Sequence, residues 1–292
     1  MAASPTQASL DRALERATQV RIKDVPQLGG TEHLLITDPD SVRQLARLLI
    51  IEPPATPFHC MCFGNQLLEF AVPWRRDVCI TLHHGCSIRW QQWDSDALLA
   101  DGEALLRWLA DRGWSGPLQE WQADRRRADE DRLAWQAWRS AAPRALAPFL
   151  ENAELASVNP EYPPEALIRA EQAHRAACAD ERTAMLQLVD WYGSGGGPWS
   201  GFPSYQSVAE ALLLRYPTAA LVEALGGQPL VAARAEGLAR LLSSWWFGRL
   251  RPGEASAVPE ELRQLLLAHV VAGGDADKRA RLAHALEPVG TV

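Results

Sequence analysis

The sequence lacks the segments that mark secreted and membrane proteins. Its first residues, MAASPTQASLDRALERATQVRIKD, carry charges throughout and contain no apolar run of secretory length. No later stretch is apolar for long enough to span a bilayer, since even LLSSWWFG is short and lies between Arg240 and Arg249. We therefore expect a soluble, cytoplasmic protein that has no membrane partner.

Basic residues are scarce, and lysine is almost absent. The 36 Asp and Glu residues outnumber the 29 Lys and Arg residues, which gives a net charge of -7. Such a surface favours solubility and argues against general binding to nucleic acid or to anionic membranes. Cysteine is sparse too, and five cysteines in 292 residues without a secretory segment are expected to be reduced thiols.

The motifs of the common enzyme classes are also missing. The sequence contains no nucleophile elbow, Walker loop, kinase signature, HExxH helix or dinucleotide-binding fingerprint. Many active sites are assembled from residues scattered along the chain and leave no such motif. An enzyme is therefore not excluded, but no reaction class is indicated.

What the chain does contain is enough apolar surface for a core, at 47% hydrophobic residues. The first third mixes strand and helix periodicities, whereas the second half is a series of short helical patterns bounded by Pro and Gly. This predicts the α+β class, with an antiparallel sheet of three to five strands packed with helices over residues 1–115. A long charged helix and a Pro-rich connection follow over 116–160. An α-helical region, either a bundle or an irregular helical repeat, occupies 161–292.

Chemistry-bearing side chains concentrate in FHCMCFGNQLLEFAVPWRRDVCITLHHGC, residues 58–86, which holds four of the five cysteines. Turns at 64–65 and 73–77 predict three antiparallel strands here, with Cys62 opposite Leu67 and Leu67 opposite His83. Alternation then defines two faces. The apolar core face holds Met61, Phe63, Leu68, Phe70, Val72, Val78, Ile80 and Leu82. The opposite face holds Cys60, Cys62, Leu67, Glu69, Ala71, Cys79, Thr81 and His83.

Thiols and imidazoles are the ligands that zinc prefers, so Cys60, Cys62, His83 and Cys86 are metal candidates. An undistorted strand nevertheless separates Cys60 from Cys62 by about 7 Å, too far for one ion. The alternative is that these thiols are simply buried beneath helices. As a catalytic set, a cysteine would be activated by an imidazole. The catalytic candidates are Cys60, Cys62, Glu69, His83 and His84.

Aromatic residues supply the binding candidates. Trp74, Arg75 and Arg76 lie in the predicted turn at 73–77, and Trp199, Phe202 and Tyr205 lie in the glycine-rich stretch WYGSGGGPWSGFPSYQ. That stretch is no phosphate loop, because it follows a helix and lacks the Gly-Lys-Ser/Thr ending. Its aromatics either contact a ligand or pack into the helical region. A further pair, His174 and Cys178, is one helical turn apart and is a weaker metal signal.

The segments CMCFGNQLLEF, HHGCSIRWQQWDSDALL and WYGSGGGPWSGFPSYQSVAEALLLRYPT resemble uncharacterised bacterial proteins of similar length, a resemblance that implies no activity. Acidity, twelve tryptophans and the missing catalytic motifs favour a cytoplasmic binding protein with a protein partner, such as an immunity protein, an antitoxin or an accessory subunit. No cofactor is required by this interpretation. The alternative is a metal- or cysteine-dependent enzyme centred on the face that holds Cys60, Cys62, Glu69 and His83, with zinc as the metal.

Overall fold

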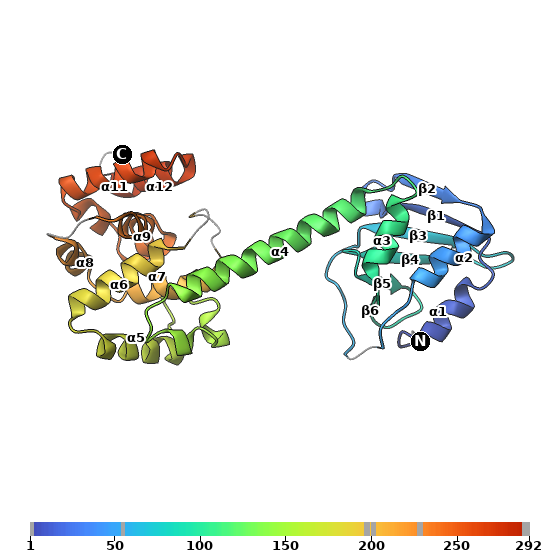
Figure 1. The fold of residues 1–292 in the computed structure, drawn as a ribbon, viewed down its shortest axis with the longest axis horizontal. Coiled ribbons are helices and arrows are strands. Elements are labelled where there is room, and N and C mark those ends of the chain that lie inside the picture. The colour runs from blue at the N-terminus through green and yellow to red at the C-terminus, as the bar shows by residue number, and fades with distance from the viewer. Residues whose placement is uncertain (1–2, 54–55, 196–198, 200–202, 227–229, 288–292) are drawn as a thin grey trace. The chain divides into compact units, whose positions relative to one another are not determined.

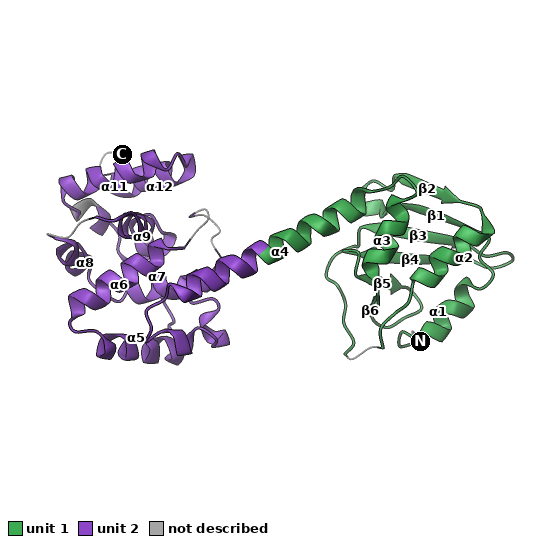
Figure 2. Ribbon diagram, viewed as in Figure 1, with its two compact units in different colours: residues 1–129 green, residues 130–292 purple. Residues whose placement is uncertain are grey.

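The computed structural model describes residues 3–53, 56–195, 199, 203–226 and 230–287. The chain divides into two compact units, unit 1 over residues 1–129 and unit 2 over residues 130–292 (Figure 2). The boundary between them falls inside helix α4 (Gly116–Ser140). Within the described ranges, no helix has the length and apolar content needed to cross a membrane.

Unit 1 contains a six-stranded antiparallel sheet with the strand order β2-β1-β3-β4-β5-β6 (Figure 1). The strands are β1 (Gln19–Asp24), β2 (Glu32–Ile36), β3 (Gln66–Ala71), β4 (Val78–His83), β5 (Ser87–Trp90) and β6 (Ala97–Leu98). The α+β prediction is confirmed, but the sheet has more strands than the three to five expected. Strand β1 begins in a segment patterned as helix, which obscured its short alternation through Val20 and Ile22, and β6 is only two residues long.

Helices α1 (Gln7–Leu14), α2 (Pro39–Leu48) and α3 (Gly102–Ala110) pack on one face of this sheet (Figure 1). Each helix begins after a side chain that caps its first turn, namely Thr6, Asp38 and Asp101. Their apolar stripes and the inward side chains of the strands form a single core. Members of this core include Leu10, Val20, Leu45, Leu68, Phe70, Ile80, Leu82 and Leu105.

The β3–β4 hairpin differs from prediction by two residues in register. Phe70 lies opposite Val78 and Leu67 lies opposite Thr81, whereas the predicted pairing set Leu67 opposite His83. Because side chains alternate with period two, a two-residue shift leaves every residue of β3 and β4 on its predicted face. The apolar core face along these two strands is therefore confirmed.

Residues 58–63 form no strand, which corrects the third predicted strand of this stretch. The segment is irregular, so the alternation that assigned Met61 and Phe63 to the core does not apply. Met61 is 98% exposed and Phe63 is 71% exposed. Pro53, Pro54 and Pro57 precede the segment in the sequence, and proline removes the backbone donors that a strand needs.

Unit 2 is helical, as predicted. Its helices are α5 (Glu165–Ala177), α6 (Glu181–Gly193), α7 (Ser207–Leu213), α8 (Thr218–Leu225), α9 (Ala232–Leu242), α10 (Trp245–Leu250), α11 (Glu260–Ala272) and α12 (Ala276–Leu286). Helices α6 and α9 cross where Gly193 meets Gly237. A Cβ atom on Gly193 would lie 1.7 Å from Ala233 O, and one on Gly237 would lie 2.0 Å from Val189 O. Only glycine therefore lets these two backbones approach so closely.

Candidate metal centre

The irregular segment 58–63 is held against the polar face of the sheet, the face turned away from α1, α2 and α3. Two side chains hold it. Arg89, on β5, donates from Nη2 to Cys60 O at 2.7 Å and from Nη1 to Cys62 O at 3.4 Å. Asp96 accepts from Cys60 N at 2.8 Å, and Asp96 N donates to Phe58 O. The backbone groups that a strand would have paired are thus satisfied by Arg89 and Asp96.

Arg89 and Asp96 also pair with each other. Arg89 donates from Nε and Nη2 to the two Asp96 carboxylate oxygens at 2.7 and 2.8 Å, a bidentate arrangement. The Asp96 side chain is fully buried. Burial alone would raise its pKa, but the hydrogen bonds from Arg89 and from Cys60 N outweigh it, so the pKa of Asp96 is lowered. The carboxylate therefore stays charged and keeps the Cys60 backbone in place.

This anchoring brings two thiols and one imidazole together. Cys60 Sγ lies 3.0 Å from Cys62 Sγ, and Cys62 Sγ lies 3.1 Å from His83 Nδ1. The ligand atoms of Cys60, Cys62 and His83 all lie within 4.8 Å of one another, and they form the one such group of three or more found in the described part of the chain. His83 is fully buried at the end of β4, and its Nε2 has no hydrogen-bond partner among the described residues.

Gly64 allows the segment to turn into β3 beside His83. Its φ is +87°, and a Cβ atom there would lie 2.2 Å from Thr81 Cγ2 and 3.3 Å from His83 Cε1. Glycine is therefore the residue that allows both the positive φ and the close approach to β4 at this position. The Gly64-Asn65 pair was expected to be a hairpin loop, and it serves as the entry into β3, where Asn65 N donates to Leu82 O.

Cys62 and His83 are in surroundings that favour their neutral forms in the absence of a metal. Burial raises the pKa of the Cys62 thiol, and the hydrogen bond with Cys60 adds to this effect. Burial lowers the pKa of His83, and the nearby Arg89 charge acts in the same direction. A free thiolate nucleophile needs the opposite environment, one that lowers the cysteine pKa. The cluster therefore suits a ligand set that is deprotonated by a bound cation.

The spacing of the cluster is close to that of a zinc site. With zinc bonds of about 2.3 Å to sulfur and about 2.0 Å to nitrogen, tetrahedral geometry separates two sulfurs by about 3.8 Å and a sulfur from a nitrogen by about 3.5 Å. The separations of 3.0 and 3.1 Å need to open by less than an ångström. Two thiolates, a neutral imidazole and one divalent cation also sum to zero charge, which a half-buried site tolerates.

Two further residues of the predicted site lie outside this cluster. Glu69, on the same face, pairs with Lys23 at 2.8 Å and with Arg21 at 3.8 Å. Cys86 follows the β4–β5 turn, and its thiol contacts the backbone oxygen of His83 at 3.6 Å. Burial raises the pKa of Cys86, and the proximity of Cys60 adds to it. Cys86 is thus a neighbour of the three ligands, while Glu69 belongs to an ion-pair network.

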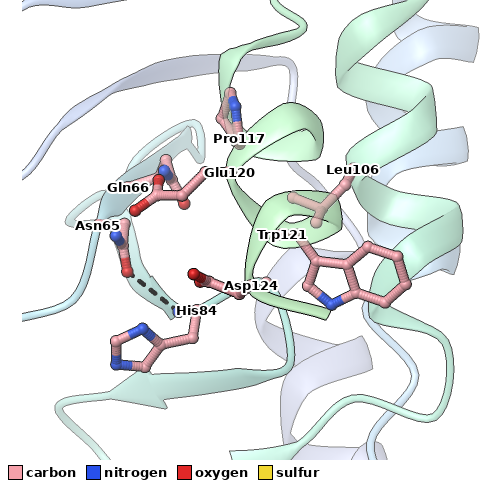
Figure 3. A pocket seen from close by; sticks show the side chains of 9 residues that line it. Asn65, Gln66, His84, Leu106, Pro117, Glu120, Trp121 and Asp124 are labelled. Carbon is pink, nitrogen blue, oxygen red and sulfur yellow. Dashed lines mark hydrogen bonds between the residues drawn. The ribbon is translucent and has the colours of Figure 1, made fainter. Parts of the chain in front are cut away.

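His84 is a turn residue. Cys86 N donates to His83 O, and both residues between them have positive φ, 51° at His84 and 68° at Gly85, the pattern of a type I′ turn. Figure 3 shows His84 and Asn65 on one side of a cavity and Leu106 and Trp121 on the other. The cavity has a volume of about 10 Å³, which is room for about one water molecule. His84 therefore faces no substrate-sized space here.

The two groups of binding candidates have different environments. Trp74, Arg75 and Arg76 are exposed at the β3–β4 turn. Trp199 is buried in unit 2, where its Nε1 donates to Glu236 at 2.9 Å, and Tyr205 packs on Trp138 with ring centroids 5.3 Å apart. Phe202 lies outside the described residues. The aromatics of the glycine-rich stretch that can be placed therefore pack into the helical unit.

Sequence reasoning did not identify Arg89 and Asp96. Neither lies within residues 58–86, and neither belongs to a ligand-type pattern. The available signal was the strand-like alternation of SIRW, residues 87–90, which puts Arg89 on the same face as Thr81, where an arginine must find partners. The comparisons with known proteins add no further signal, since no family model, no curated protein and no solved structure matches this chain.

Proposed function

We propose that unit 1 binds a zinc ion through Cys60, Cys62 and His83, and that the ion fixes the irregular segment 58–63 to the sheet. The observation that carries this proposal is the convergence of the two thiols on the buried His83 imidazole. His83 Nδ1 is the nitrogen that faces the thiols, so it is the ligand atom. Arg89, which is paired with Asp96, donates to the carbonyl groups of both cysteines and thereby orients the ligands.

Two versions of this site differ in the fourth ligand. If Cys86 completes the tetrahedron, the site is closed and structural. The metal then holds segment 58–63, with its exposed Met61 and Phe63, in place. If water completes it, the site has the open position of a catalytic zinc, the enzyme alternative. Cys86 contacts His83 O at 3.6 Å, which places its thiol beside the three ligands as the candidate for the closed version.

Metal analysis of the purified full chain tests the proposal. We expect one zinc per chain after loading under reducing conditions, and loss of that zinc in Cys60→Ser, Cys62→Ser and His83→Ala. The matched control is Cys178→Ser, since Cys178 also neighbours a histidine but has no third ligand at the described positions. Zinc bound equally by the wild type and His83→Ala, or a native Cys60–Cys62 disulfide in place of the metal, contradicts the proposal.

A second candidate function is that of a protein-binding module, such as an immunity protein, an antitoxin or an accessory subunit. The observation that favours it is Trp74, whose side chain is fully exposed at the tip of the β3–β4 hairpin. Exposed tryptophan is costly to hydrate and is enriched at binding hot spots. Capture of a partner from the native host by the wild type, and not by Trp74→Ala, tests this function. Equal capture by both proteins contradicts the part assigned to Trp74.

A further inference from the structure

A hollow of about 450 Å³ lies between helix α1 and the base of the β3–β4 hairpin, within unit 1. Its floor is apolar and is formed by Val72, Val78 and Trp90. Its charged lining residues are Arg12, Arg75 and Arg76, and no carboxylate of a described residue lines it. On a chain with a net charge of -7, three arginines around one apolar floor form a local basic site.

These arginines make no ion pair within the described part of the chain. Arg12 donates to the backbone oxygen of Ala8 at 3.1 Å, a contact that leaves its charge uncompensated. Several other arginines of unit 1 do have acidic partners, as in Arg21–Glu32 at 2.7 Å and Arg89–Asp96. The charges of the three groups around the hollow are therefore not neutralised by a carboxylate of a described residue.

The neighbouring turn holds a tryptophan in a strained conformation. Arg75 N donates to Val72 O, which leaves Pro73 and Trp74 as the central residues of the turn. Trp74 has a φ of 64°, at the position where type II turns favour glycine or asparagine. Its side chain contacts solvent fully, so packing within the chain does not explain its presence there. Strain of this kind is found where a side chain serves a binding role.

We propose that this hollow binds an acidic peptide segment of a partner protein that carries one large apolar side chain. The carboxylates pair with Arg12, Arg75 and Arg76, and the apolar side chain covers the Val72, Val78 and Trp90 floor beside Trp74. The overall negative charge of the chain repels a long phosphate polymer and so favours a short acidic peptide over nucleic acid. This inference rests on the second candidate function and specifies its partner.

Selection of a displayed random dodecapeptide library on the immobilised full chain tests the inference. We expect the enriched peptides to combine Asp or Glu with an aromatic or large aliphatic residue. Enrichment of peptides without acidic residues overturns the acidic-peptide inference and leaves the binding function standing. If no peptide is enriched, both the inference and the binding function are contradicted.

Variants locate the binding of the selected peptides. Measured by fluorescence anisotropy, the Kd should rise about tenfold or more in Arg12→Glu and in Arg75→Glu/Arg76→Glu. The control is Arg16→Glu, the same charge reversal just after α1 at a residue that does not line the hollow. Trp74→Gly should weaken binding while its Tm equals or exceeds that of the wild type. Unchanged affinity for the peptides in these variants overturns the inference. So does single-stranded DNA or RNA that binds more tightly than the peptides and loses affinity in the same variants.

Discussion

In each unit a cysteine thiol lies close to a histidine ring, and the Cys178–His174 and Cys62–His83 pairs have different surroundings. In unit 2, His174 Nε2 lies 3.1 Å from Ala184 O, while Cys178 Sγ is 3.9 Å from His174 Nδ1 and contacts Gln187. In unit 1, Cys62 Sγ is 3.1 Å from His83 Nδ1, a second thiol is adjacent, and His83 Nε2 has no partner among the described residues. The His174 imidazole therefore helps to join α5 and α6, whereas the His83 imidazole is available as a metal ligand.

The two units also use the carboxylates of their hydrogen-bond networks differently. In unit 2, Glu236 accepts from Trp199, His269 and Lys278, which together tie α9, α11 and α12 to one another and to Trp199. In unit 1, Asp96 accepts from Cys60 N, and Arg89 donates to the backbone oxygens of Cys60 and Cys62. The unit 2 network stabilises helix packing, whereas the unit 1 pair positions two thiols. The following predictions test this contrast, from the largest effect to the smallest.

Removal of the buried carboxylate by Asp96→Ala should have the largest effect. It leaves the Arg89 guanidinium and Cys60 N without their partner, and we expect a loss of about 3 kcal/mol in the free energy of unfolding of unit 1. Asp190→Ala in unit 2 is the matched control, because Asp190 is also paired bidentately with an arginine but its side chain is 35% exposed. We expect a loss of about 1 kcal/mol there. Equal losses of unfolding free energy in Asp96→Ala and Asp190→Ala, measured by denaturant unfolding, would contradict the proposed difference between the two units.

A methyl group at the entry to β3 should have the next largest effect. Gly64→Ala combines a positive φ with a Cβ 2.2 Å from Thr81, and we expect it to destabilise unit 1 by about 2 to 3 kcal/mol and to weaken zinc binding. Gly113→Ala is the control, because Gly113 has a φ of +93° and a methyl group added there would meet no described atom within 4 Å. It should lose only about 1 kcal/mol and keep its zinc affinity. Similar zinc affinities in both variants would contradict the positioning role of Gly64.

The stability of unit 2 should depend on pH through His174. Burial lowers the pKa of His174, and the adjacent Arg175 charge adds to this effect. Because the folded state holds the imidazole neutral, its contribution is complete above the unfolded pKa of about 6.5 and decreases as the pH falls below it. We expect a loss of about 1.4 kcal/mol per pH unit at most, and a flatter profile in His174→Gln. Hydrogen exchange of unit 2 amides between pH 7 and pH 5.5 measures this loss, and identical profiles would rule out His174 as its source.

Relief of strain at the hairpin tip should give the smallest effect, and a stabilising one. Trp74→Gly places glycine at the left-handed position of the turn, and we expect unit 1 to become more stable by about 1 kcal/mol. Trp74→Ala keeps the strain and serves as the control, with a change close to zero. Thermal unfolding distinguishes the two. A destabilised Trp74→Gly variant would show that the exposed indole stabilises the fold.

Much of unit 1 could be predicted from its periodicity. The alternation in β3 and β4 identified the core face correctly because buried and half-buried side chains alternate along nearly the whole length of both strands. The same rule failed at Met61 and Phe63, because residues 58–63 obtain their hydrogen bonds from Arg89 and Asp96 and not from a neighbouring strand.

The candidate site forms because residues 58–63 are not a regular strand. A regular strand would have held Cys60 and Cys62 about 7 Å apart, and only an irregular backbone brings their sulfurs to 3.0 Å. The ligand types were visible in the sequence, but their convergence depends on contacts between residues far apart in the chain. Arg89 lies 29 positions from Cys60 and 27 from Cys62, and no local pattern predicts such a contact.

Cobalt substitution tests the central claim most directly, since cobalt(II) takes the place of zinc and reports its ligands by absorption. Full-length protein loaded with cobalt(II) under reducing conditions should show thiolate-to-cobalt charge transfer and the intense visible bands of a tetrahedral site at one ion per chain. The charge-transfer band should decrease in Cys60→Ser and in Cys62→Ser and should be unchanged in Cys178→Ser. A spectrum with only the weak bands of an octahedral oxygen site, or with charge transfer that persists without both cysteines, would contradict the proposed centre.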